Sequence, residues 1–209
     1  MTLAAPLSAG LASMDLTLDA AQQEKLLAYV ALLSKWNKVY SLTAIREPRR
    51  MVTHHLLDSL APLPHLKGEQ LRILDVGSGF GTPGIPLAIA RPDWQLVLLD
   101  SNQKKTTFLR QALLELKLPN VSIVTDRVEL YRPDSPFHII TSRAFAELAD
   151  FVQLTRHLLA QGGEWAALKG VYPHEEISRL PADIRVAGVD VLCVPELDAE
   201  RHLVHLVQA

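Results

Sequence analysis

Apolar residues recur at helical spacing near the start of the chain. Between about Leu18 and Tyr40 they lie three or four positions apart, which predicts one amphipathic helix. Thr17 or Asp19 is placed to cap this helix, and we expect acidic residues in its first turn. The apolar positions that define the pattern are Leu26, Leu27, Val30, Leu33 and Trp36.

A second helix is predicted over residues 48–60. It opens on a proline, which suits a first helical position, and Pro62 and Pro64 stop it. Residues 1–15 lack a strong period, so we expect them to fray. The two helices precede every other element and are interpreted as an N-terminal helical cap over residues 1–67.

Short apolar runs and helical segments alternate after Gly68, and this alternation predicts a mostly parallel sheet covered on both faces. The last two strands follow one another without a helix, which predicts an antiparallel pair at one edge. We therefore expect residues 68–209 to form a doubly wound α/β domain, packed with the cap as one compact unit. The predicted strands are 71–76, 95–99, 121–124, 137–141, 164–168, 184–194 and 202–207, and the predicted helices are 83–90, 103–116, 147–159 and 175–180.

A glycine-rich turn follows the first predicted strand. It spans residues 75–84 and reads Asp-Val-Gly-Ser-Gly-Phe-Gly-Thr-Pro-Gly. Such a turn between strand and helix lets the backbone approach a ligand closely, with amide donors facing it. Asp100 ends the next strand, where a carboxylate can accept hydrogen bonds from a ribose diol. Together these features predict a nucleoside-containing cofactor.

The glycine spacing leaves two cofactor classes open. Gly77-x-Gly79-x-Gly81 is typical of S-adenosylmethionine methyltransferases, whereas Gly79-x-Gly81-x-x-Gly84 fits the dinucleotide fingerprint equally well. Asp75 favours the first class, because its carboxylate can meet a cationic amino acid moiety. The roughly 125 residues after the turn also leave little room for a separate substrate domain. A tight turn without any ligand is the plain structural alternative.

An ordered set of short motifs, spread over nearly the whole chain beyond Leu18, resembles the glucose-inhibited division protein B family. This resemblance implies a bacterial methyltransferase acting on guanine N7 of small-subunit ribosomal RNA, with a Rossmann-like, seven-stranded fold and S-adenosylmethionine as cofactor. It favours a methyltransferase over a dehydrogenase. The motifs are Trp36-Asn37-Lys38, Ser41-Leu42-Thr43, His55-Leu56-Leu57-Asp58-Ser59, Asp75-Val76-Gly77, Pro83-Gly84-Ile85-Pro86-Leu87, Ser142-Arg143-Ala144, Leu168-Lys169-Gly170 and Glu200-Arg201-His202-Leu203.

The resemblance also implies where the cofactor binds. It places the pocket at Gly77, Thr82, Val128, Glu129 and Arg143. Reasoning from the residues alone adds the carboxylates and the turn, and we expect an adenine ring against Val128. The added cofactor-binding candidates are Asp75, Gly79, Gly81 and Asp100.

Three of these positions have competing interpretations. Glu129 is equally well explained as a solvated carboxylate at a helix start, and a surface salt bridge is the alternative for Arg143. The family usually has a small and then a bulky apolar residue where this chain has Phe80 and Thr82. We expect the backbone contacts of the turn to survive this departure, whereas a side-chain contact at Thr82 is questionable.

The implied chemistry needs no general base. Guanine N7 has an in-plane lone pair and no proton, so catalysis rests on holding the reacting atoms in line, with Arg143 as the positioning candidate. His54, His55 and Asp58 lie at helical spacing, but no further ligand motif supports a metal. We interpret them as a helix-face hydrogen bond between histidine and aspartate and predict no metal site.

Charge does not favour a protein that coats nucleic acid. The chain has 21 Lys and Arg against 23 Asp and Glu, a net charge of −2. Residues 25–173 alone hold 18 basic and 13 acidic side chains, which is compatible with docking at one RNA site. The target base must be unstacked, so we expect a loop or single-stranded substrate. The RNA-binding candidates are Lys104, Lys105, Lys169 and Arg201, with Lys35, Lys38, Arg46, Arg49 and Arg50 in the cap.

Two other functions remain open: a non-catalytic RNA-binding factor of ribosome assembly that keeps the fold, and a nicotinamide-dependent dehydrogenase. We expect a cytoplasmic monomer without a membrane segment, because no basic residue precedes Lys25 and the apolar stretch Leu26–Leu33 is too short to span a bilayer. Cys193, the single cysteine, lies in an apolar run and is predicted to be a small buried hydrophobe.

Overall fold

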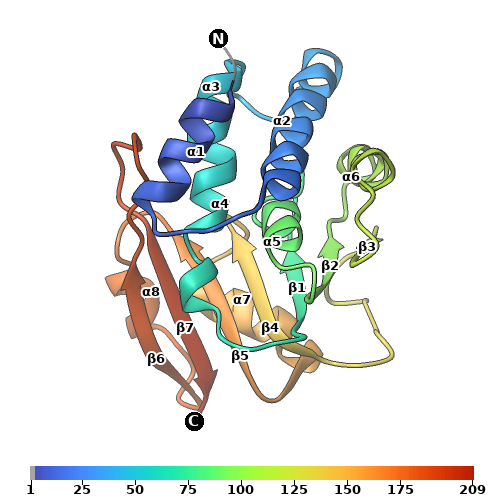
Figure 1. Ribbon diagram of the computed structural model, residues 1–209. Coiled ribbons are helices and arrows are strands. Elements are labelled where there is room, and N and C mark those ends of the chain that lie inside the picture. Colours follow the sequence, from blue (N-terminus) through green and yellow to red (C-terminus); the bar gives the residue numbers. More distant parts are fainter. Residues whose placement is uncertain (1–2) are drawn as a thin grey trace.

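The computed structural model describes residues 3–209, which form a seven-stranded sheet packed between helices (Figure 1). The strand order is β3-β2-β1-β4-β5-β7-β6. Strands from β3 to β5 pair in parallel, and β7 pairs antiparallel with both β5 and β6. The doubly wound fold and its antiparallel pair at one edge are therefore confirmed. The strands are β1 (Arg72–Val76), β2 (Gln95–Leu99), β3 (Val121–Val124), β4 (Phe137–Arg143), β5 (Leu159–Lys169), β6 (Ile184–Val191) and β7 (His202–Gln208).

Alternate residues of each strand face two different cores, because successive side chains point to opposite faces. In β2, Leu96 and Leu98 pack with α5, α6 and the N-terminal helices, whereas Val97 and Leu99 pack with α7. The helices therefore cover both faces of the sheet (Figure 1). Their bounds are α1 (Ala4–Ser13), α2 (Ala20–Tyr40), α3 (Pro48–Met51), α4 (Asp58–Leu60), α5 (Gly84–Ala90), α6 (Gln103–Leu116), α7 (Leu148–Thr155) and α8 (His174–Ser178).

The N-terminal segment is ordered, so the expectation that residues 1–15 fray is wrong for the described part. Residues 4–13 form α1, and Leu7 and Leu11 are buried. A Cβ atom built on Gly10 would lie 2.3 Å from a side-chain atom of Leu57, so the two segments touch closely. Packing of α1 on the other helices of the cap stabilises this helix. Two buried leucines are too few to show a helical period in the sequence. Residues 1 and 2 lie outside the described residues.

The two predicted cap helices are present, with one irregularity. Asp19 caps α2 in a capping box with Gln22, although no acidic residue lies in the first turn. The second helix is continuous from α3 to α4, but its middle, Val52–Leu57, is a π-helical turn. Such turns are rare and frequently lie at functional sites, because the extra residue redirects the side chains that follow.

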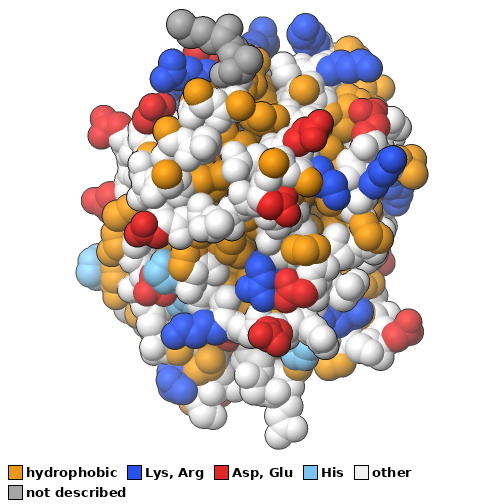
Figure 2. All heavy atoms as spheres, in the orientation of Figure 1, with side chains coloured by type: hydrophobic (Ala, Val, Ile, Leu, Met, Phe, Trp, Pro, Cys, Tyr) orange, Lys and Arg blue, Asp and Glu red, His pale blue; other side chains and the backbone are white. Residues whose placement is uncertain are grey.

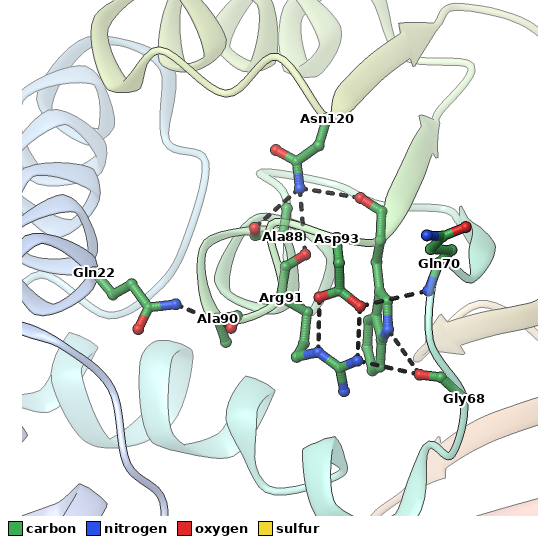
Figure 3. A network of polar contacts seen from close by, with 9 residues as sticks. Gln22, Gly68, Gln70, Ala88, Ala90, Arg91, Asp93 and Asn120 are labelled. Atoms are coloured by element: carbon green, nitrogen blue, oxygen red, sulfur yellow. Dashed lines mark hydrogen bonds and ion pairs between the residues drawn. The ribbon is translucent and has the colours of Figure 1, made fainter.

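A polar network closes the end of α5 and ties it to α2 (Figure 3). Asn120 donates from its amide nitrogen to the carbonyl oxygens of Ala88 and Trp94, and Gln22 donates to that of Ala90. Arg91 and Asp93 form a two-pronged ion pair beside them. Carbonyl groups at a helix end have no partner within the helix, so these side chains supply one. The cap is thereby fixed to the helix that follows the glycine turn.

Two further predictions are wrong. The helix expected over residues 147–159 ends at Thr155, a 3₁₀ turn (Arg156–Leu158) follows, and β5 already begins at Leu159. Cys193 is exposed, because β6 ends at Val191 and the residues beyond it leave the sheet. No helix of the described residues is long and apolar enough to cross a membrane.

Candidate active site between two pockets

The site lies where the strand order reverses, between the carboxyl ends of β1 and β4. Open α/β sheets bind ligands at such a switch point. The glycine turn leaves β1 here with positive φ angles of 67° at Gly77 and 100° at Gly81. A Cβ atom at Gly77 would lie 2.8 Å from the ring of Phe145, and one at Gly81 would lie 2.6 Å from Ile85. Only glycine fits both positions.

Several amide groups of the glycine turn donate within the protein, and the expectation that amides of this turn face a ligand stays a prediction. Gly77 and Ser78 both donate to the carbonyl oxygen of Leu99, at 2.9 and 3.1 Å. The N–H of Gly79 donates to Oδ2 of Asp100 at 2.9 Å. Leu99 is the last residue of β2, so these bonds hold the start of the turn against the end of that strand. The glycines therefore fix Asp100 in place.

A pocket of about 380 Å³ lies beside Asp100. It brings together Gly77, Asp100, Val128 and Glu129, which the sequence analysis names for the cofactor. Lys105, named there for RNA, also lines it and places its Nζ 3.7 Å from Oδ2 of Asp100. We call this cavity the smaller pocket. A carboxylate, an apolar side chain and a second carboxylate at the rim suit a ribose and a flat base.

Asp75 is the penultimate residue of β1 and is fully buried. Its Oδ2 accepts from the N–H of Gly84 at 3.0 Å, whereas Oδ1 has no partner within residues 3–209, and neither has Oγ of Ser78. Burial raises the pKa of Asp75 to about 7, against the hydrogen bond from Gly84 and the charge of Arg143. Buried polar atoms without partners are uncommon, and a functional role is one explanation for them. These two lie beside the glycine turn.

Arg143 ends β4 and connects three segments. Its Nη1 donates to Oδ2 of Asp58 at 3.0 Å and to the carbonyl oxygen of His54 at 3.3 Å, and its Nη2 donates to Oγ1 of Thr82. Thr82 thus makes a side-chain contact, but with Arg143. Neither side chain lines the smaller pocket. At the other departing position, the ring of Phe80 lies 5.9 Å from the guanidinium carbon of Arg143.

Asp58 is the residue that sequence reasoning misjudged. It accepts from Arg143 and, through Oδ1, from Nε of Arg201 at 2.7 Å. The predicted histidine–aspartate hydrogen bond is wrong, because His55 bonds Oγ1 of Thr43 and His54 bonds Arg50. A signal was available: an acidic residue among apolar neighbours on a buried helix face requires a cationic partner.

A larger cavity of about 960 Å³ opens beside these arginines. Lys169 and Arg201, both RNA candidates, line it together, and Lys169 also pairs with Glu176 at 2.6 Å. Lys104 is exposed at the start of α6 and lies outside it. Ala144, with a φ of 55°, lines both this larger pocket and the smaller one. The two pockets are therefore neighbours across a single residue.

Basic side chains lie at the end of the molecule toward which the parallel strands point. The strands β1, β2 and β4 point toward the end where α2 stops and α3 begins, and Figure 2 shows Lys and Arg side chains gathered there. The cap cations that the sequence analysis names are all exposed at this end; they are Lys35, Lys38, Arg46, Arg49 and Arg50. A positive surface borders the site.

Comparison with known proteins agrees with this arrangement. Residues 22–204 match the family described as rRNA small subunit methyltransferase G (GidB). The chain belongs to this family. Ribosomal RNA small subunit methyltransferase G of Laribacter hongkongensis is 62% identical over 206 residues, covering 99% of each chain, and that of Neisseria meningitidis serogroup B is 59% identical over 200 residues, covering 96% of each.

The rRNA small subunit methyltransferase G family confirms the resemblance and the enzyme class, a methyltransferase, that the motifs imply. Among solved structures, a SAM-dependent methyltransferase from Aquifex aeolicus superposes with a TM-score of 0.57 at 19% identity, covering 78% of this chain and 94% of that one. This likeness confirms the Rossmann-like methyltransferase fold.

Proposed function

We propose that this chain transfers a methyl group from S-adenosylmethionine to N7 of a guanine in small-subunit ribosomal RNA. The observation that carries the proposal is the meeting of two pockets at Ala144, at the switch point of the sheet. One pocket has the carboxylate and apolar groups that suit a nucleoside, and the other is bordered by cations. Family membership supports the same reaction.

The residues of the smaller pocket fit the cofactor. Asp100 is placed to accept from a ribose, and Val128 offers an apolar surface to a base. Asp75 and Ser78 do not line this pocket but belong to the glycine turn, as does its lining residue Gly77. Their buried Oδ1 and Oγ atoms, without a partner within residues 3–209, suit the polar groups of a methionine moiety. S-adenosylmethionine supplies, when bound, an electrophilic methyl group on a sulfonium centre. The chain contributes binding and orientation.

On the substrate side, the larger pocket has room for an unstacked nucleotide. Arg143 and Arg201 form its positively charged wall, and Ala144 lines both this pocket and the smaller one. Because N7 has no proton to lose, no general base is required, and the residues act by fixing the base and excluding water. His55 is unsuited to proton transfer near neutrality, since burial and the charge of Arg143 lower its pKa to about 4.

The division into a cap over residues 1–67 and a methyltransferase domain over residues 68–209 is part of this proposal. The cap supplies Asp58 and the exposed cations, while the domain supplies both strand ends of the site. RNA binds across this end through phosphate contacts, and its affinity falls as salt is raised. The proposal includes a monomer in the cytoplasm, and it is compatible with the presence of both pockets on one chain.

The test uses ribosomal RNA from a strain that lacks the gene. The protein is incubated with this RNA, or with intact small subunits, and with methyl-labelled S-adenosylmethionine. Chemical cleavage at 7-methylguanosine followed by primer extension then maps the product. We expect one new cleavage site, which is already present in wild-type RNA, and no labelling of a transcript in which 7-deazaguanosine replaces guanosine.

Each alternative function predicts a different result. RNA binding without methyl transfer to either substrate would overturn the proposal in favour of a non-catalytic assembly factor. Calorimetric binding of NAD in preference to S-adenosylhomocysteine would overturn it in favour of a dehydrogenase. Label that enters RNA without a cleavage site would show methylation of another atom.

A further inference from the structure

Asp58 lies at the meeting point of three segments that are distant in the sequence. It follows the π-helical turn Val52–Leu57 and is 3% exposed. Its two cationic partners come from the end of β4 and from the residue before β7. The carboxylate therefore connects the cap to the end of β4 and to the start of β7, the two places from which the arginines reach the larger pocket.

The geometry assigns one carboxylate oxygen to each arginine. Oδ2 accepts from Arg143 at 3.0 Å, and Oδ1 accepts from Arg201 at 2.7 Å. Both arginines line the larger pocket, so a single buried group sets the position of both positive charges on its wall. Guanidinium groups held by charge-assisted hydrogen bonds at fixed oxygens have little freedom to rotate.

Arg143 also connects this arrangement to the glycine turn. Its Nη2 donates to Oγ1 of Thr82, three residues after Gly79, whose own N–H holds Asp100 of the smaller pocket. A chain of direct contacts thus runs from Arg201 through Asp58 and Arg143 to the turn between the pockets. The π-helical turn directly before Asp58 is the local irregularity that accompanies this position of the carboxylate.

We propose that Asp58 is a positioning residue for methyl transfer: it holds Arg143 and Arg201 as a fixed pair against the target nucleotide and keeps that pair in register with the glycine turn. This inference rests on the function proposed above. It assigns no contact between Asp58 and the reacting atoms. The carboxylate acts through the two arginines.

The decisive variant is Asp58→Asn, which keeps the shape of the side chain but presents an amide N–H₂ group to one arginine. We expect kcat for RNA methylation to fall at least thirtyfold, because one guanidinium loses its fixed position. Affinity for S-adenosylhomocysteine, measured by calorimetry, should change less than threefold, since Asp58 does not line the smaller pocket. Asp58→Glu restores the carboxylate and should recover part of the lost kcat.

Asp183→Asn is the matched control. Asp183 pairs with Arg156 at 2.9 Å, but on an exposed surface away from both pockets. The same chemical change at an aspartate–arginine pair should leave kcat and the RNA KM unchanged. A kcat loss at Asp183 equal to that at Asp58 would overturn the inference.

The remaining outcomes separate the inference from the proposed function. If the wild-type protein methylates no guanine, the proposed function fails. If it does, and Asp58→Asn melts at lower temperature but keeps its kcat per folded molecule, Asp58 is only structural and the inference fails. Should Asp58→Asn not fold, Arg201→Lys retains the charge without the guanidinium fork. We expect at least a fivefold loss of kcat in the folded Arg201→Lys protein, and an unchanged kcat would overturn the inference.

Discussion

Two partly buried ionic clusters, each with side chains from the sheet or from the residue next to it, have opposite charge arrangements. In the site cluster, formed by Asp58, Arg143 and Arg201, one carboxylate lies between two guanidinium groups. In the edge cluster, formed by His205, Glu164 and Asp190, the imidazole of His205 lies between two carboxylates, and His65 places its Nδ1 3.1 Å from the same Asp190. His205 places Nδ1 3.2 Å from Glu164 and Nε2 3.0 Å from Asp190.

The difference lies in what can lose its charge. Arginine side chains are always charged in proteins. Histidine titrates near neutrality, and the hydrogen bond and charge of Glu164, followed by those of Asp190, raise the pKa of His205. The molecule thus has a cluster whose cations are arginines at its candidate site and a cluster built on a titrating histidine in the antiparallel part of the sheet.

The strongest way to break the site cluster is Arg143→Ala. We expect methyl transfer to fall about 10²- to 10³-fold, because the variant removes a fixed donor between the two pockets. The protein should still fold, since Asp58 retains Arg201. Single-turnover methylation measures the loss, with Arg156→Ala as the control from an exposed pair. Unchanged specific activity together with a lower melting temperature would contradict this expectation.

The edge cluster should respond in stability and not in activity. His205→Gln removes hydrogen bonds between charged groups and should cost about 1.5–3 kcal/mol at pH 6. Because the pKa of His205 is higher in the folded protein than in the unfolded chain, protonation of His205 stabilises the folded state. This stabilisation is complete below the ordinary histidine pKa of about 6.5, and it is lost as the pH rises through the raised pKa of the folded protein. Urea unfolding at pH 6 and pH 9 tests it. An equal cost at both pH values would contradict titration of His205.

Asp75 sharpens the comparison, because it is a buried carboxylate without an ion-pair partner among residues 3–209. With its pKa at about 7, it must lose a proton to meet the cationic amino group of S-adenosylhomocysteine. Binding should therefore tighten about tenfold between pH 6 and pH 8. Calorimetry of the wild type and of Asp75→Asn checks this, and the variant should lose the pH dependence. The same slope in both proteins would rule out Asp75 as its origin.

The smallest effect is expected at an exposed pair on the rim of the larger pocket. Glu196 lies 3.7 Å from Arg49, with both side chains more than half exposed. Glu196→Gln should change the free energy of unfolding by less than about 0.5 kcal/mol, because water screens such pairs. The urea midpoint measures it. A larger cost would show that burial is not what distinguishes the site cluster from a surface ion pair.

Local sequence signals located much of the fold. Residues 95–99, 103–116 and 121–124 have the predicted bounds, since each run is short, strongly patterned and closed by turn or capping residues. Asn102, for example, accepts from the N–H of Lys104 at the start of α6. By contrast, α1 forms because two leucines pack on the cap, and Cys193 is exposed because β6 ends early. Both outcomes depend on tertiary contacts.

The residues of the candidate site also divide into those that the local sequence predicts and those that only tertiary contacts define. The glycine turn and Asp100 could be found, because a motif of ten residues and the next strand end specify them. The role of Asp58 could not, because its partners lie 85 and 143 residues away along the chain. Only the closed sheet brings those arginines to one carboxylate. A buried acid at the start of α4 signals that cations are needed but does not say which.

The order of strands has a consequence for synthesis. β7 is translated after β6 yet lies between β5 and β6, so neither of these neighbours has its full set of ladder hydrogen bonds until β7 arrives. Because domains begin to fold while the chain is still being made, a nascent chain that ends before β7 exposes two unpaired strand edges. It also lacks Arg201, which directly precedes β7. The segment that completes the sheet therefore also completes the positively charged wall of the larger pocket. A ribosome-bound fragment that ends before it should be both prone to aggregation and inactive.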